Sequence, residues 1–217
     1  MEEIRDGYIR VSEVLGRLKD RTKINQLVLK EKCDIGTEVH SNIHMEVLGV
    51  PVSFEKFPIR NPITGNILFD RDGNERWEKR GVGYFRSWHM WEQLHMPEYV
   101  HMEQRMYCDK YMITGQIDAL VRFPGDNNLK LLDFKCSYAP DMEIWPMQAH
   151  FYWYLLTQNG FTLSPDMYFL QLKPLDKQGK VQKPSLLEFT FDEKILSHCL
   201  DEALLCWEEK KNAMLLD

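Results

Sequence analysis

The order of the elements predicted along this 217-residue chain indicates an α/β fold, with a mixed central sheet flanked by helices. Apolar residues recur at helical spacing early in the chain and near its end, whereas the segments between them alternate as strands do. The resulting order is helix, three strands, helix and further strands. The sequence is 44% hydrophobic and 12% aromatic, enough to bury a sizeable core. We expect a single domain over 1–217, with an inserted arm at about 51–81.

The N-terminal elements are predicted to be helical. A short helix runs from Ser12, a good N-cap residue, towards Leu18, and a longer helix follows at about 24–48. Residues of two adjacent rows recur there every four positions, namely Ile35, Val39 and Ile43, and Gly36, His40 and His44. The glycine one turn before His40 leaves room for another group to approach the helix.

The middle of the chain changes character twice. From 51 to 81, turn sequences such as Pro62-Ile-Thr-Gly65 and Asp70-Arg-Asp-Gly73 predict an inserted hairpin or flexible arm. A helix at 84–95 and a strand at 99–111 follow. Strands at 112–123 and 129–136 then flank a Pro-Gly-Asp-Asn-Asn turn and form a hairpin. The last predicted elements are a helix at 144–158, strands at 166–172 and 186–191, and a helix at 192–215.

Three charged residues interrupt the apolar strands of the hairpin. Alternation places Gln116, Asp118 and Leu120 on one side, with Ile117, Ala119 and Val121 on the other. The hairpin brings Asp118 beside Asp133, and Lys135 shares the face of Asp133. Two close carboxylates repel each other unless one is protonated or a cation lies between them. Oxygen ligands suit Mg²⁺ or Mn²⁺, and the Phe134 carbonyl is a further candidate ligand.

The following helix offers two more polar side chains. Gln148 and Tyr152 are four residues apart, so they lie on one helical face. Both can donate a hydrogen bond to a phosphate or orient a lysine.

These motifs resemble the PD-(D/E)XK nuclease superfamily, specifically its RecB-like exonuclease branch. The residues that carry the resemblance are Gly115-x-x-Asp118, Asp133-Phe-Lys135, Gln148-x-x-x-Tyr152 and the helical His40 in Gly-Thr-Glu-Val-His. No proline precedes the first aspartate, and the second acid is Asp rather than Glu. The resemblance spans about 36–152 and implies a restriction-endonuclease-like core of order αβββαβ.

The resemblance also implies roles for single residues. A divalent metal, Mg²⁺ or Mn²⁺, would be held by His40, Asp118, Asp133 and the Phe134 carbonyl. Lys135 would position or help deprotonate the attacking water, and Gln148 and Tyr152 would orient the substrate backbone. Some members add a glutamate from the preceding strand, for which Glu103 is the candidate, although an ordinary strand charge explains Glu103 equally well.

The expected function is therefore metal-dependent hydrolysis of DNA phosphodiester bonds by a RecB-like exonuclease. Two alternatives stay open: a nucleic-acid-binding or assembly subunit with little catalysis, and an endonuclease of restriction or repair type. The presence of Asp118, Asp133 and Lys135 together argues against the first. The expected partner is DNA, single- or double-stranded and entered at its ends; a homo-oligomer, or a partner protein of recombination or replication, is left open.

Composition narrows the other classes. The formal net charge of −6 gives no general attraction to nucleic acid, so binding needs a metal or a local basic surface such as the arm's Arg71, Arg76, Trp77, Lys79 and Arg80. A solvated charged loop is the more frequent explanation for that run. The His40-x-x-x-His44 pair lacks the glutamate that follows the first histidine in a zinc protease, which argues against zinc-dependent hydrolysis. Without a long apolar stretch or a signal segment, we expect a cytoplasmic protein with no membrane contact.

The five cysteines are odd in number and scattered, which argues against a disulfide framework and a zinc knuckle. We expect reduced, mostly buried thiols. Relatives with an iron–sulfur cluster place one cysteine before the nuclease core and three close together after it. Here only Cys199 and Cys206 follow Tyr152, so we expect no such cluster.

Overall fold

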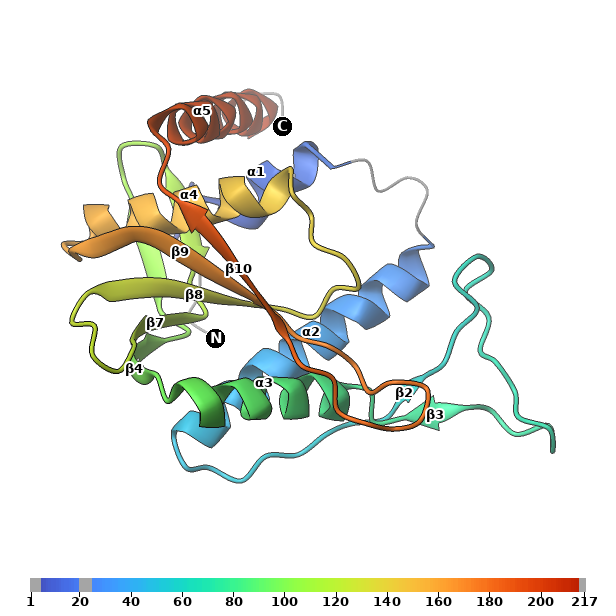
Figure 1. Cartoon of the computed structure of the whole chain (residues 1–217). Coiled ribbons are helices and arrows are strands. Elements are labelled where there is room, and N and C mark those ends of the chain that lie inside the picture. The colour runs from blue at the N-terminus through green and yellow to red at the C-terminus, as the bar shows by residue number, and fades with distance from the viewer. Residues whose placement is uncertain (1–4, 20–24, 215–217) are drawn as a thin grey trace.

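The computed structural model in Figure 1 describes residues 5–19 and 25–214. Its helices are α1 (Val11–Arg17), α2 (Gln26–Val47), α3 (Gly81–His95), α4 (Ile144–Gln158) and α5 (Glu193–Met214). Its strands are β1 (Ile9–Arg10), β2 (Phe57–Pro58), β3 (Trp77–Glu78), β4 (Glu98–Met102), β5 (Arg105–Cys108), β6 (Ile113–Gln116), β7 (Ala119–Arg122), β8 (Leu129–Lys135), β9 (Leu163–Gln171) and β10 (Ser185–Thr190). None of the helices in the described ranges is long and apolar enough to cross a membrane.

The central sheet has five strands in the order β10-β9-β8-β7-β4. Its pairs are antiparallel except β8 with β9, which run parallel. Parallel neighbours need a long crossover connection, and α4 supplies it between these two strands. This mixed sheet flanked by helices agrees with the predicted α/β class. The finer assignment to a restriction-endonuclease-like αβββαβ core stays a prediction.

Each face of the sheet is covered by its own hydrophobic core. Residues of α1, α4 and α5 fill the core on one face, and residues of α2 and α3 fill the core on the other. The strand β8 contributes to both, because Leu131 belongs to the first core and Leu132 and Phe134 belong to the second. Figure 1 shows α4 and α5 on the side of the sheet opposite α2 and α3.

The two long strands predicted at 99–111 and 112–123 are each broken, which corrects the sequence interpretation. Here β4 and β7 pair in the central sheet, while β5 and β6 pair in a second, three-stranded sheet with β1. The breaks face each other: the Glu103 N–H donates to the Asp118 carbonyl, and the Ile117 N–H donates to the Gln104 carbonyl, both at 3.0 Å. Glu103 adopts a φ of 51°, a left-handed conformation that is uncommon for a non-glycine residue.

The bend also overturns one predicted facing. Ile117 was expected on the side of Ala119 and Val121, but it packs with Leu120 in the core beneath α4. Alternation of side chains holds only within an unbroken strand, and the break at Ile117 and Asp118 resets it.

Smaller differences concern element ends. Helix α1 has Arg10 rather than Ser12 at its N-cap, two residues earlier than predicted, so Ser12 lies inside the first turn. Helix α3 begins at Gly81 rather than Tyr84, and β9 begins at Leu163. The predicted start of α2 at residue 24 and end of α5 at 215 lie outside the described residues.

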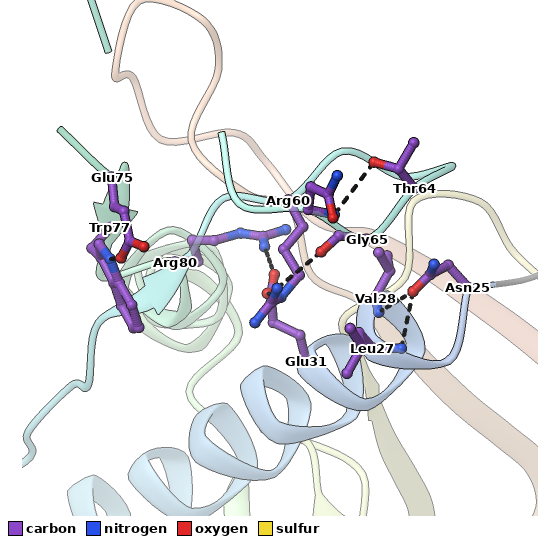
Figure 2. Close-up of polar contacts among 11 residues, drawn as sticks. Asn25, Leu27, Val28, Glu31, Arg60, Thr64, Gly65, Glu75, Trp77 and Arg80 are labelled. Atoms are coloured by element: carbon purple, nitrogen blue, oxygen red, sulfur yellow. Dashed lines mark hydrogen bonds and ion pairs between the residues drawn. The ribbon is translucent and has the colours of Figure 1, made fainter. Parts of the chain in front are cut away.

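The arm before α3 is an irregular hairpin that docks on α2. Its short strands β2 and β3 pair, and isolated bridges join Arg60 to Ile67 and Phe69 to Glu75. Figure 2 shows the buried Glu31 of α2 bound by both Arg60, at 3.1 Å, and Arg80. Asn25 caps α2 and also donates from its amide to the Ile63 carbonyl at 3.3 Å. These contacts fix the arm to the N-terminal half of α2.

Candidate metal centre

The break between the two sheets brings three ligand-type side chains together. His40 comes from α2, Glu103 from the end of β4 and Asp118 from the start of β7. One ligand atom from each lies within 4.8 Å of the others. His40 Nδ1 is 3.1 Å from Asp118 Oδ1. The bend, rather than a continuous strand, therefore places Glu103 beside Asp118.

The second oxygen of Asp118 ties the cluster to β8. Asp118 Oδ2 accepts a hydrogen bond of 2.7 Å from the Phe134 N–H. Because Ala119 pairs with Leu132, the next position along each strand sets Asp118 opposite Asp133. The Lys135 ammonium forms an ion pair with Asp133 Oδ2. The structure thus gathers Asp118, Asp133 and Lys135 at one end of the hairpin, with His40 and Glu103 beside them.

Burial and mutual repulsion separate the protonation behaviour of the two aspartates. Burial raises the pKa of Asp133 to about 7, with the charge of Asp118 adding to the rise and Lys135 opposing it. For Asp118 burial acts in the same direction, but His40, Lys135 and the Phe134 N–H outweigh it and hold its pKa below the usual value. Two carboxylates in one site whose pKa values are shifted in opposite directions are typical of functional centres.

Burial and neighbouring charges also set the pKa values of the other two candidate ligands, Glu103 and His40. Burial, followed by the charge of Asp118, raises the pKa of Glu103. Burial alone would lower the pKa of His40, but the Asp118 carboxylate and a hydrogen bond with Cys136 raise it well above its ordinary value.

The donor set fits a hard divalent cation. Glu103 and Asp118 share one group of ligand atoms with His40, whereas Asp133 lies outside that group and pairs with Lys135. In the described part of the chain, the cationic partners of these three carboxylates are the imidazole of His40 and the ammonium of Lys135. Among the described residues, the only partner of the buried Asp133 Oδ2 is that ammonium. A carboxylate-rich, oxygen-dominated site of this kind suits Mg²⁺ or Mn²⁺.

The predicted pair on α4 also reaches the cluster. Gln148 Nε2 donates to the Tyr152 hydroxyl at 3.1 Å. Burial, then the charges of Asp133 and Asp118, raise the pKa of Tyr152, so its phenol stays protonated at neutral pH. A Cβ on Gly115 would lie 2.8 Å from Tyr152 Cε1. The glycine of the Gly-x-x-Asp motif therefore lets the tyrosine ring approach the strand.

Sequence reasoning missed the support behind Glu103. Gln116 Nε2 donates to Glu103 Oε2 at 2.5 Å, and Arg105 Nη2 donates to Gln116 Oε1 at 2.7 Å. The register of β5 and β6 places Arg105 directly opposite Gln116. The sequence alone does not show that register, so it could not predict the contacts from Arg105 through Gln116 to Glu103. Such outer contacts orient metal ligands.

Other candidates lie elsewhere. His44 is half-buried and outside the described metal-type group. In the arm, Arg76 pairs with Glu78 and Arg80 pairs with Glu31. All five cysteines are unpaired, but the expectation that most are buried is wrong: only Cys108 and Cys199 are buried, Cys33 is exposed, and Cys136 and Cys206 are half-buried.

Comparisons with known proteins give distant likenesses only. No protein family and no curated protein matches the chain. A crystal structure named "putative exonuclease" from Eubacterium rectale has a TM-score of 0.43 and 10% identity over 94% of this chain and 84% of that one. The structure of LHK-Exo in complex with dAMP has a TM-score of 0.42 and 9% identity over 96% of this chain and 89% of that one. Likenesses with TM-scores this low carry no argument about family or activity.

Proposed function

We propose that this protein is a metal-dependent nuclease that hydrolyses DNA phosphodiester bonds, an exonuclease of the RecB-like type. One observation carries the proposal: the bend of the hairpin gathers the buried carboxylates of Asp118 and Asp133 and the half-buried carboxylate of Glu103 beside His40 and Lys135. Carboxylates this close together are costly unless one is protonated or a cation joins them, and a bound cation would let all three stay ionised. The sequence motifs that these residues occupy support the same class.

The proposed chemistry divides between the metal and the chain. A divalent ion held by His40, Glu103, Asp118, Asp133 and the Phe134 carbonyl would lower the pKa of bound water and neutralise charge on the phosphate. The ammonium of Lys135 supplies positive charge where negative charge develops on the attacked phosphate, and it positions the water.

The residues of α4 act on the substrate backbone. Burial, followed by the charges of Asp133 and Asp118, raises the pKa of Tyr152, so its phenol keeps the proton that it can donate to a phosphate oxygen. The hydrogen bond from Gln148 fixes the orientation of that phenol.

The test is hydrolysis of end-labelled linear DNA with Mg²⁺ or Mn²⁺. Lys135→Ala should lower the rate about 100- to 1,000-fold, the usual effect of removing one group that stabilises developing charge. Lys194→Ala, which changes an exposed lysine at the start of α5, should leave the rate unchanged. Full activity of Lys135→Ala, or no hydrolysis with either metal, would overturn the proposal. Cleavage of closed circular DNA at the same rate would convert the assignment to an endonuclease.

A further inference from the structure

A cavity of about 460 Å³ lies beside the candidate metal centre, where three segments of the chain meet. It is lined by Lys32, Cys33 and Ile35 of α2, by Arg80 and Tyr84 at the start of α3, and by Cys136, Ser137 and Tyr138 after β8. Its volume is within the range of sites for single small ligands, roughly 300 to 1,000 Å³. It can therefore hold one nucleotide unit, and a duplex is too large for it.

The cavity and the metal centre share a wall. Cys136 follows Lys135 directly and lines the cavity. The cavity consequently adjoins the end of β8, the strand that carries Asp133 and Lys135.

The charged residues of the cavity are positive, although the whole chain is negative. Lys32 is exposed and forms no ion pair with any described residue. Arg80 and Arg60 share the single carboxylate of Glu31, which leaves one positive charge uncompensated in that cluster. Figure 2 shows Arg80 reaching Glu31 from the base of the arm. This balance suits a phosphodiester backbone.

An aromatic side chain at the cavity has no structural task. Tyr138 is 95% exposed, so its ring packs against almost nothing. Tyr84, on the facing helix, is half-buried. Exposed rings beside positive charge are the usual platform on which unpaired bases stack.

A second cavity of about 350 Å³ extends the first. It shares Arg80 and Tyr84 and continues between Lys79 and the β9–β10 loop at Pro174 and Asp176. We refer to these two cavities, which meet at Arg80 and Tyr84, as the groove. The acidic Glu78 and Asp176 line its second part, so its excess of positive charge lies in the first.

We propose that this groove, defined by Lys32, Arg80, Tyr84 and Tyr138, binds a single-stranded DNA segment next to the metal centre. Lys32 and Arg80 contact its phosphates, and an unpaired base stacks on Tyr138. The inference rests on the proposed function and names its substrate class: DNA whose end is single-stranded where it meets the metal.

The test is a binding measurement that needs no catalysis. Fluorescence anisotropy in EDTA, on protein carrying Lys135→Ala, compares a labelled ten-nucleotide oligo-dT with a ten-base-pair blunt duplex. Tyr138→Ala should weaken oligo-dT binding about 10-fold, as expected for loss of one stacked base, while Tyr138→Trp retains it. Lys32→Ala should weaken it severalfold, whereas Lys30→Ala, an exposed lysine of the same helix, should not. Binding of the duplex should change less than twofold in every variant.

Two outcomes would overturn the groove. One is oligo-dT binding that Tyr138→Ala and Lys32→Ala leave unchanged. The other is an equal loss of duplex and single-strand binding, which indicates general charge attraction. Because the assay contains no metal and no active lysine, its result is independent of hydrolysis. If the protein binds oligo-dT in the groove but wild type hydrolyses no DNA, the proposed nuclease activity is wrong and the proposed binding site is retained.

Discussion

The protein contains two clusters built around buried carboxylates, Glu31 in one and Asp118 and Asp133 in the other, and their charges are arranged in opposite ways. In the arm-docking cluster, the single carboxylate of Glu31 is met by two guanidiniums, from Arg60 and Arg80. In the metal-centre cluster, the carboxylates of Glu103, Asp118 and Asp133 outnumber the neighbouring cations, His40 and Lys135. In the first cluster the cations outnumber the single carboxylate, whereas in the second the carboxylates outnumber the cations.

This difference in charge balance indicates which of the acidic residues have a structural role and which are candidates for a functional one. A carboxylate whose two oxygens each bind an arginine has a structural explanation, since burial of a charge is tolerated when it is paired. A group of carboxylates with one pKa raised and another lowered has no such balance. Its composition fits the divalent cation of the proposed function.

The largest expected effect on stability lies in the arm-docking cluster. Glu31→Gln leaves two partly buried guanidiniums without their partner and should lower the free energy of unfolding by about 3 kcal/mol. Urea unfolding measures it. The control is Glu46→Gln, which changes an exposed glutamate of the same helix and should cost less than about 0.5 kcal/mol. Equal effects of the two substitutions would remove the contrast between the clusters.

In the metal-centre cluster, removing a carboxylate charge should have the opposite effect on stability: Asp133→Asn should gain stability relative to wild type as the pH rises. The folded pKa of Asp133, about 7, exceeds its ordinary value of 3.8, so the folded chain holds a proton that the unfolded chain has lost between those pH values. That contribution to stability is complete below the unfolded pKa and is lost as the pH rises through 7. In EDTA, wild type should therefore lose stability relative to Asp133→Asn between pH 5 and pH 8.

Urea unfolding of both proteins at several pH values checks this prediction. Saturating Mn²⁺ should restore the stability of wild type at pH 8 and do little for Asp133→Asn. A stability difference that is flat with pH, or that rises with it, would contradict an uncompensated carboxylate at this position.

A smaller effect is expected from the support behind Glu103. Gln116→Met removes the hydrogen bonds to Glu103 and Arg105 and keeps the approximate volume. It should weaken Mn²⁺ binding about 10-fold, the lower end for loss of a group that orients a ligand. Gln178→Met, on the exposed β9–β10 loop, is the matched control. If Gln116→Met binds Mn²⁺ as tightly as wild type, Glu103 is not held for a metal by this contact.

The smallest effect is expected at His44. It lies one turn from His40 on α2, but outside the group of ligand atoms around Asp118. His44→Ala should leave Mn²⁺ affinity within about twofold, whereas His40→Ala should weaken it tenfold or more. Mn²⁺ titrations of the two variants separate them. A comparable loss for both would indicate a site running along the helix.

The sequence predicted what depends on local pattern. Asp118 and Asp133 could be placed together because strand alternation and a short turn fix the pairing of a hairpin. Gln148 and Tyr152 could be paired because helical spacing is regular. For the same reason His40 could be assigned to a helical face.

What the sequence could not predict depends on tertiary contacts. No glycine marks the bend at Glu103, where the positive φ is held by the facing chain and by the second sheet. The ion pairs of Glu31 join residues 29 and 49 positions apart, a separation that no local pattern reports. Gln116 became visible as a partner of Glu103 only once the register of β5 and β6 was known.

Calorimetric titration with Mn²⁺ at pH 8 tests the central claim most directly. Wild type and Glu31→Gln, at a temperature where both are folded, should bind the ion alike, while Asp118→Asn, which removes the carboxylate shared by His40 and the Phe134 N–H, should bind it at least tenfold more weakly. Absence of binding to wild type, or equal binding by Asp118→Asn, would contradict a metal centre at the bend of the hairpin.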